Sequence, residues 1–182
     1  MRNEEVKSEE TQAEPNWFRE VTVSACGLGY LPVAPGTWGS AGAAAVALFL
    51  WWYLPHAVAL AALGAGVLLC LILGMRFCPW AENYYGEKDP GTFVIDEVAG
   101  QWMACLLFMW APQSALAATA AAFVAFRVFD IIKPPPARKI EQLPGGRGTM
   151  LDDLVAALYA AAAVWIIFSL RPDIFAYPVL SH

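Results

Sequence analysis

Hydrophobic positions in this chain gather into five segments that are separated by short polar stretches. The apolar runs cover residues 41–54, 56–75, 98–111, 114–129 and 154–170. Each run is close to, or slightly shorter than, the ~20 apolar residues that cross a bilayer as one helix. The pattern predicts an all-α fold: a helical membrane bundle with about five apolar helices and polar loops.

Two of the connections are too short to hold more than a turn. Pro55 separates the first two segments, and a proline-containing step at 111–113 separates the third from the fourth. Because proline interrupts helices, both sites predict tight helical hairpins. The hairpin tips should therefore lie on one side of the membrane, and residues 1–40, 76–97 and 127–153 on the other.

The basic side chains indicate which side faces the cytoplasm. Ten of the eleven basic residues fall on the side opposite the hairpin tips, and only Arg171 follows the last segment. Lysine and arginine accumulate in cytoplasmic loops of membrane proteins. The polar loops are therefore expected to be cytoplasmic. The ten residues are Arg2, Lys7, Arg19, Arg76, Lys88, Arg127, Lys133, Arg138, Lys139 and Arg147.

Composition agrees with a membrane protein. Hydrophobic residues make up 59% of the 182 positions, against roughly 45–50% in soluble domains. The alternative is a soluble helical bundle, which the shortness of the segments favours. Residues 1–20 hold nine of the 27 charged side chains (11 basic and 16 acidic) and are expected to form a disordered cytoplasmic tail. One membrane domain is expected over 21–171, followed by a C-terminal tail over 172–182.

Two classes of partner are disfavoured by the remaining polar residues. The net charge is −5 and no basic stripe is present, so nucleic acid is not an expected partner. The four cysteines form no Cys-x2-Cys pair, which argues against zinc. Cys70 and Arg76 match the Cys-x5-Arg spacing of cysteine phosphatases, but the residues between them are apolar. A membrane helix ending at Arg76 is the preferred interpretation.

A loop rich in glycine and proline, residues 27–40, leads into the first apolar segment. Backbone amides around Gly36, Thr37 and Ser40, with two hydroxyls and a helix N-terminus, are suited to binding an anion. The alternative is a shaped turn in which Ser40 caps the following helix.

Acidic residues stand in pairs where two apolar segments begin. Asp96 and Glu97 precede the third segment, and Asp152 and Asp153 follow a glycine-rich loop before the fifth; Asp130 is added near the end of the fourth. Five carboxylates on one face repel one another unless cations lie between them. Oxygen ligands without histidine or thiolate favour Mg²⁺ over zinc. The sequence therefore predicts a magnesium site formed by these five residues.

Basic residues accompany the acidic ones. Arg127, Asp130 and Lys133 are spaced i, i+3, i+6 before a run of three prolines, which predicts one shared helical face. A ladder of ion pairs within the helix is the alternative. Together with Arg138, the side chains of Arg127 and Lys133 could neutralise the negative charge of a phosphoryl group. Asp130, Asp153, Arg127 and Lys133 are the predicted catalytic residues, and water and aspartate both remain open as the nucleophile.

These motifs resemble those of the bacterial phosphatidylglycerophosphatase A family. The matching stretches, within about residues 20–170, are GLGYLPVAPGTWGS, DPGTFVIDEVAGQ and FRVFDIIKPPPARKIEQLPGGRGTMLDD. The resemblance implies Mg²⁺-dependent removal of the terminal phosphate of phosphatidylglycerophosphate at the bacterial inner membrane, giving phosphatidylglycerol. Thr149 and Ala157 depart from the family pattern, and neither departure removes a predicted ligand.

Two other functions compete with a lipid phosphatase. A phospholipid headgroup transferase would need a nucleotide-lipid site, and the chain has no Asp-Gly-x2-Ala-Arg run. A small cation transporter would carry charges deep in its helices on both sides of the midplane. The predicted charges stop at one interface, so hydrolysis of a lipid phosphate is the leading hypothesis.

Overall fold

The computed structural model describes residues 13–108 and 115–175, and within these ranges all regular structure is helical. The predicted all-α fold is confirmed. The elements in chain order are α1 (Trp17–Val23), η1 (Leu28–Tyr30), α2 (Pro35–Tyr53), α3 (His56–Tyr85), α4 (Ile95–Phe108), α5 (Ala115–Ile132), α6 (Ala137–Ile140), α7 (Arg147–Leu170) and η2 (Pro172–Phe175).

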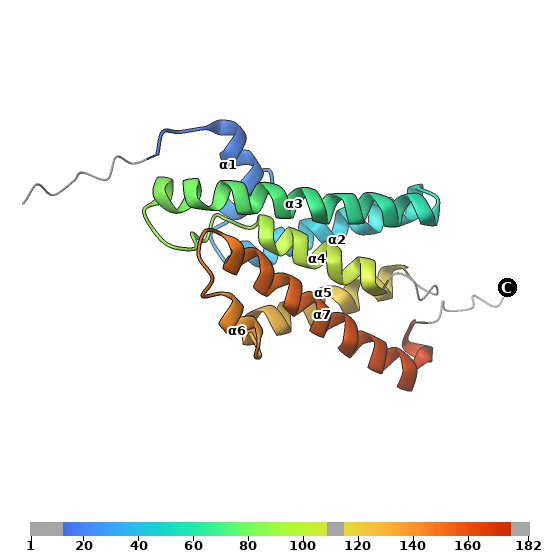
Figure 1. The fold of residues 1–182 in the computed structure, drawn as a ribbon. Coiled ribbons are helices and arrows are strands. Elements are labelled where there is room, and N and C mark those ends of the chain that lie inside the picture. The colour runs from blue at the N-terminus through green and yellow to red at the C-terminus, as the bar shows by residue number, and fades with distance from the viewer. Residues whose placement is uncertain (1–12, 109–114, 176–182) are drawn as a thin grey trace, which may run out of the picture.

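Helix α4 lies at the centre of the bundle and contacts α2, α3, α5 and α7 (Figure 1). Small residues allow this close approach: Ala104, Ala122 and Ala157 are fully or almost fully buried. At Gly100 a Cβ would lie 2.5 Å from the ring of Phe126. Helices in lipid associate through such close backbone packing rather than through a hydrophobic driving force.

Three helices, α3, α5 and α7, are long and apolar enough to cross a membrane by length and composition. With α2 and α4, they correspond to the five expected segments. Large apolar side chains such as Leu68, Ile72, Val124 and Ile166 are exposed on the outer surface of these helices. Exposed apolar surface of this extent is typical of contact with lipid.

The helix boundaries differ from the apolar runs. Helix α2 begins at Pro35 instead of residue 41, α3 continues to Tyr85 instead of ending near residue 75, and α7 begins at Arg147 instead of residue 154. Pro35 occupies the first helical position, where a proline N–H is not needed and its φ is already helical. Apolar runs mark the part of a helix inside lipid, and the helices extend beyond it.

The ends of the chain contain short helices. Helix α1 begins inside the expected tail over residues 1–20, whose first twelve residues lie outside the described ranges. Likewise η2 occupies the start of the expected C-terminal tail, and 176–182 are outside the described part.

Polar segments collect at one end of the bundle. There α1, the loop between α3 and α4, and α6 lie beside the starts of α4 and α7, whereas the α2–α3 turn lies at the opposite end (Figure 1). Every acidic and basic motif singled out in the sequence belongs to this first end. The fold thus places the candidate chemistry at one boundary of the apolar bundle.

Candidate active site

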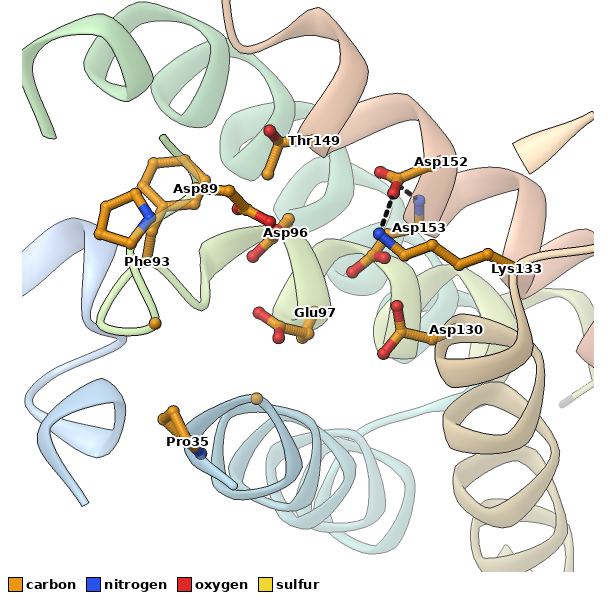
Figure 2. Close-up of a pocket in the computed structure, with 13 residues that line it drawn as sticks. Pro35, Asp89, Phe93, Asp96, Glu97, Asp130, Lys133, Thr149, Asp152 and Asp153 are labelled. Atoms are coloured by element: carbon orange, nitrogen blue, oxygen red, sulfur yellow. Dashed lines mark hydrogen bonds and ion pairs between the residues drawn. The ribbon is translucent and has the colours of Figure 1, made fainter. Parts of the chain in front are cut away.

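Five carboxylates from three helices line one cavity of about 120 Å³. Asp96 and Glu97 come from the first turn of α4, Asp130 from the last turn of α5, and Asp152 and Asp153 from the second turn of α7. Figure 2 shows the side chains of Asp96, Glu97, Asp130 and Asp153 directed toward the same space. The structure therefore brings together all five residues that were predicted to bind metal.

Asp96, Glu97 and Asp153 form the tightest group, here called the carboxylate triad. One oxygen from each lies within 4.8 Å of the other two. Asp96 Oδ1, Glu97 Oε2 and Asp153 Oδ2 are buried and have no hydrogen-bond partner among the described residues. Buried, unpaired carboxylate oxygens are strongly unfavourable. A hard divalent cation would neutralise the repulsion and use these oxygens as ligands, so the triad fits Mg²⁺.

Arg127 of α5 contacts side chains of two other helices, Glu97 of α4 and Ser40 of α2. Its Nη1 lies 2.7 Å from Asp130 Oδ2 and 3.9 Å from Glu97 Oε1, and it donates to Ser40 Oγ at 3.4 Å. The Nε of Arg127 is buried and has no hydrogen-bond partner within residues 13–108 and 115–175. A guanidinium held by carboxylates and retaining a free N–H is suited to binding an oxyanion.

Lys133 approaches the cavity from a different backbone position than predicted. Helix α5 ends at Ile132, and Lys133 has a left-handed φ of +46°, so the expected i+6 helical face is wrong for this residue. The following residue is Pro134, which disfavours helical backbone at the position before it. Lys133 Nζ donates to Asp152 Oδ2 at 2.6 Å and to Glu141 Oε1 at 2.8 Å.

The charge of Lys133 is held in place by these partners. Burial disfavours the ammonium, but the hydrogen bonds to Asp152 and Glu141 outweigh burial and raise the pKa of Lys133. The ammonium is therefore retained at neutral pH. It neutralises Asp152, which distinguishes that carboxylate from the unpartnered oxygens of the triad.

The predicted phosphate-binding residues of the first loop are not all at the cavity. Gly36 lines it, whereas Thr37 and Ser40 are not among the lining residues. Ser40 is buried inside α2, where its hydroxyl donates to the Gly36 carbonyl at 2.9 Å. It is not a helix cap, because α2 begins five residues earlier, at Pro35, with Ala34 as its N-cap.

Arg138, the fourth predicted phosphate ligand, is exposed and lies outside the carboxylate cavity. It lines an adjacent cavity with Lys88 and Gln142. The two cavities share Asp89 and Thr149. Arg138 is therefore a neighbour of the site and does not reach its centre.

Asp89 and Glu141 were not singled out as site residues from the sequence. Asp89 lines the cavity with a left-handed φ of +53°; burial raises its pKa, and the nearby Lys133 ammonium opposes that rise. The available signal was its position at the start of the DPGTFVIDE motif. Glu141 holds Lys133 from outside the cavity, and nothing in its sequence context indicates that role.

The Cys-x5-Arg match does not form a phosphate-binding loop. Cys70 is buried in the interior of α3, which continues without a break beyond Arg76. A thiolate nucleophile needs an accessible, electropositive setting. The helical interpretation of this segment is confirmed, although α3 ends nine residues later than expected, at Tyr85.

Similarity to known proteins agrees with this site. A family model described as phosphatidylglycerophosphatase A matches residues 21–168. Phosphatidylglycerophosphatase A of Escherichia coli is 33% identical over 142 residues, covering 78% of this chain and 78% of that protein. The Haemophilus influenzae protein of the same name is 35% identical over 147 residues, covering 78% and 83% respectively.

A third relative carries a different name. A putative phosphatidylinositol-3-phosphatase of Bacteroides thetaiotaomicron is 35% identical over 163 residues, covering 84% of this chain and 98% of that protein. No solved structure is significantly similar to the chain. The family model spans α2 to α6, α7 up to residue 168, and every residue of the carboxylate cavity. The chain belongs to the phosphatidylglycerophosphatase A family of membrane lipid phosphatases.

Proposed function

We propose that this enzyme hydrolyses the terminal phosphate of phosphatidylglycerophosphate in a Mg²⁺-dependent reaction, giving phosphatidylglycerol and inorganic phosphate. The observation that carries the proposal is the carboxylate triad, in which three buried oxygens from Asp96, Glu97 and Asp153 have no hydrogen-bond partner in the described part of the chain. Two relatives named phosphatidylglycerophosphatase A support the choice of substrate.

The residues divide into those that hold metal and those that hold phosphate. Asp96, Glu97 and Asp153 would hold Mg²⁺, which supplies positive charge to the phosphoryl oxygens and lowers the pKa of water. Lys133 lines the cavity, so its ammonium would hold the phosphate. Arg127 does not line the cavity and would act through Asp130 and Glu97, from which its Nη1 lies 2.7 Å and 3.9 Å away. Phosphoryl transfer depends mainly on such positioning and charge neutralisation.

Asp130 is the candidate for accepting a proton from an attacking water. One of its oxygens is held by Arg127 at 2.7 Å, and the residue lines the cavity. Asp152 is less suited to that role because Lys133 occupies one of its oxygens at 2.6 Å and the Asp153 amide donates to the other at 3.0 Å. Asp152 is therefore assigned to orienting Lys133 and the backbone of α7.

The lipid would be bound from the inner leaflet of the bacterial inner membrane. The apolar helices would hold its chains in the bilayer, and the polar end of the bundle would hold the phosphate at the boundary. The excess of basic residues at this end supports a cytoplasmic active face. A cation transporter is disfavoured because the buried carboxylates gather at one end of the bundle.

The name of the Bacteroides relative makes substrate choice the first test. Purified protein in detergent micelles with Mg²⁺ should release phosphate from phosphatidylglycerophosphate with a kcat/KM at least about tenfold higher than from phosphatidylinositol 3-phosphate. A flexible glycerol phosphate enters a small polar cavity more readily than a phosphate on a bulky ring. The reverse preference, measured by colorimetric phosphate release, would reject the proposed substrate.

A further inference from the structure

An apolar groove runs between α2 and α5 on the lipid-facing side of the bundle. Its volume is about 230 Å³, and its lining is almost entirely apolar. Ala44 and Ala45 of α2 lie on one side, and Ala120 and Phe123 of α5 lie on the other. Ala45 and Ala120 are exposed, so the groove opens outward and is not part of the core.

The groove is in register with the carboxylate cavity. On α5, Phe123 and Thr119 of the groove precede Asp130 of the cavity by seven and eleven residues. On α2, Ala44 and Leu48 of the groove follow the cavity residue Gly36 by eight and twelve residues. Residues spaced by three or four share one face of a helix. Arg127 and Ser40, which contact each other at 3.4 Å, line neither the cavity nor the groove and occupy the turns of α5 and α2 between them.

A polar group inside the groove lacks a protein partner. Thr119 is 5% exposed, lines the groove, and its hydroxyl has no hydrogen-bond partner among the described residues. It precedes Asp130 by eleven positions, or roughly 16 Å along the helix at 1.5 Å per residue. In a phospholipid with a terminal phosphate, the ester carbonyls follow the phosphate at a comparable separation. An ester carbonyl is an acceptor that this hydroxyl lacks.

We propose that the α2–α5 groove binds one acyl chain of the lipid substrate, with Thr119 donating to an ester carbonyl. The inference rests on the proposed function, because the phosphate of the same lipid must occupy the carboxylate cavity. Arg127 occupies the turn of α5 between the two parts, and its buried Nε has no hydrogen-bond partner among the described residues. Chain binding in the groove would thus fix the headgroup in the cavity.

A second apolar cavity provides a matched comparison. It lies between α2, α3 and α4, has a volume of about 520 Å³, and includes Val46, Gly66 and Trp102. On α4 it is lined by Ile95 and Val98, and neither acidic residue of that helix lines it. Although this cavity is larger, its lining contains none of the buried polar side chains that lack a partner among the described residues. A substitution of Val46 therefore fills the second cavity, whereas the same substitution at the adjacent Ala45 fills the groove.

Groove-filling variants test the proposal kinetically. Ala45→Phe and Ala120→Phe should raise KM for dioleoyl phosphatidylglycerophosphate about tenfold, because the phenyl ring fills the groove and displaces acyl-chain methylenes that it would bury. Their kcat for that lipid should stay within twofold. Activity toward a dibutyryl analogue, whose chains are too short to fill the groove, should be retained. Val46→Phe should leave both substrates unaffected, and Thr119→Val should raise KM for the long-chain lipid a few fold.

Unchanged KM for the long-chain lipid in both groove variants would overturn the proposal, as would an equal loss with the dibutyryl analogue. A raised KM in Val46→Phe alone would assign the chain to the α2–α3–α4 cavity instead. A second measurement is independent of turnover: phosphatidylglycerol with a photoreactive acyl chain should label residues 41–48 and 116–123, and Ala45→Phe should abolish this labelling. Uniform labelling of all lipid-facing helices would overturn the proposal that the groove binds the acyl chain. Wild-type protein that is inactive on both lipids would contradict only the proposed function.

Discussion

Asp153→Asn is expected to lower kcat/KM for phosphatidylglycerophosphate about 10³-fold, the upper range for removing one group that stabilises transition-state charge. The substitution keeps the shape of the side chain but removes a metal-binding carboxylate from the triad. Asp153 is 3% exposed, and its Oδ2 has no partner in the described structure. A purely structural role would require such a partner. The substitution should therefore lower activity without lowering the thermal stability of the protein.

Thermal unfolding separates the two roles of Asp153. In EDTA the variant should be at least as stable as wild type, because neutralising one of three adjacent carboxylates relieves their repulsion. Asp173→Asn is a matched control: Asp173 pairs with Arg171 at 2.8 Å on the exposed end of the bundle, and its loss should leave turnover within about twofold, since surface pairs contribute little. Turnover by Asp153→Asn within tenfold of wild type would contradict the assignment.

Gly36→Ala should lower kcat about 10²-fold, although it removes no functional group. A Cβ at this position would overlap the Glu97 carboxylate and lie 3.3 Å from Arg127 Nη1. Glu97 would have to move away from Asp96 and Asp153, and a displacement of about 1 Å at a reacting site costs on the order of 10²-fold. Alanine also has the higher helix propensity. The variant should therefore remain folded, as measured by thermal unfolding, while losing phosphate release.

Gly64→Ala is the control for Gly36→Ala. Gly64 lies within α3, and the nearest atom to a Cβ there is Leu106 Cδ2 at 3.9 Å. The same chemical change therefore meets ordinary van der Waals contact, and activity should equal that of wild type. Equal activity of both alanine variants would show that the close approach of α2 to Glu97 is not needed for turnover.

The arrangement of the carboxylates could be predicted from the sequence because helical hairpins constrain where polar residues meet. Once alternate connections are assigned to one side, Asp96, Asp130 and Asp153 must lie at the same end of the bundle. The structure places them there. Their selection as metal ligands remains a proposal, since a carboxylate at the same end can instead pair with a cation, as Asp152 does with Lys133.

The details that sequence could not provide depend on helix ends. Treating 27–40 as a loop brought Thr37 and Ser40 into the predicted phosphate site, but α2 begins at Pro35 and Ser40 points to the Gly36 carbonyl. Similarly, the predicted helix extended through Lys133 and therefore placed this side chain on the same helical face as Arg127 and Asp130. The proline that follows Lys133 disfavours helical backbone there, so the helix ends one residue earlier. Hydropathy does not indicate helix termini to within one turn.

The sequence pattern also could not predict which non-glycine residues adopt a left-handed backbone conformation. Asp89 and Lys133 both have positive φ values, +53° and +46°, and both line the cavity. Such conformations are uncommon for these residue types and persist only where surrounding contacts impose them. Their occurrence at the cavity indicates that the loops after α3 and α5 are shaped around the site.

The central claim, that buried carboxylates hold Mg²⁺ for hydrolysis of a lipid phosphate, is tested most directly by phosphate release from phosphatidylglycerophosphate. Purified wild-type protein should release phosphate with Mg²⁺, stop in excess EDTA, and recover when Mg²⁺ is restored; Asp153→Asn should stay inactive at Mg²⁺ concentrations that saturate wild type. Full wild-type activity in EDTA, or full activity of Asp153→Asn with Mg²⁺, would contradict the account.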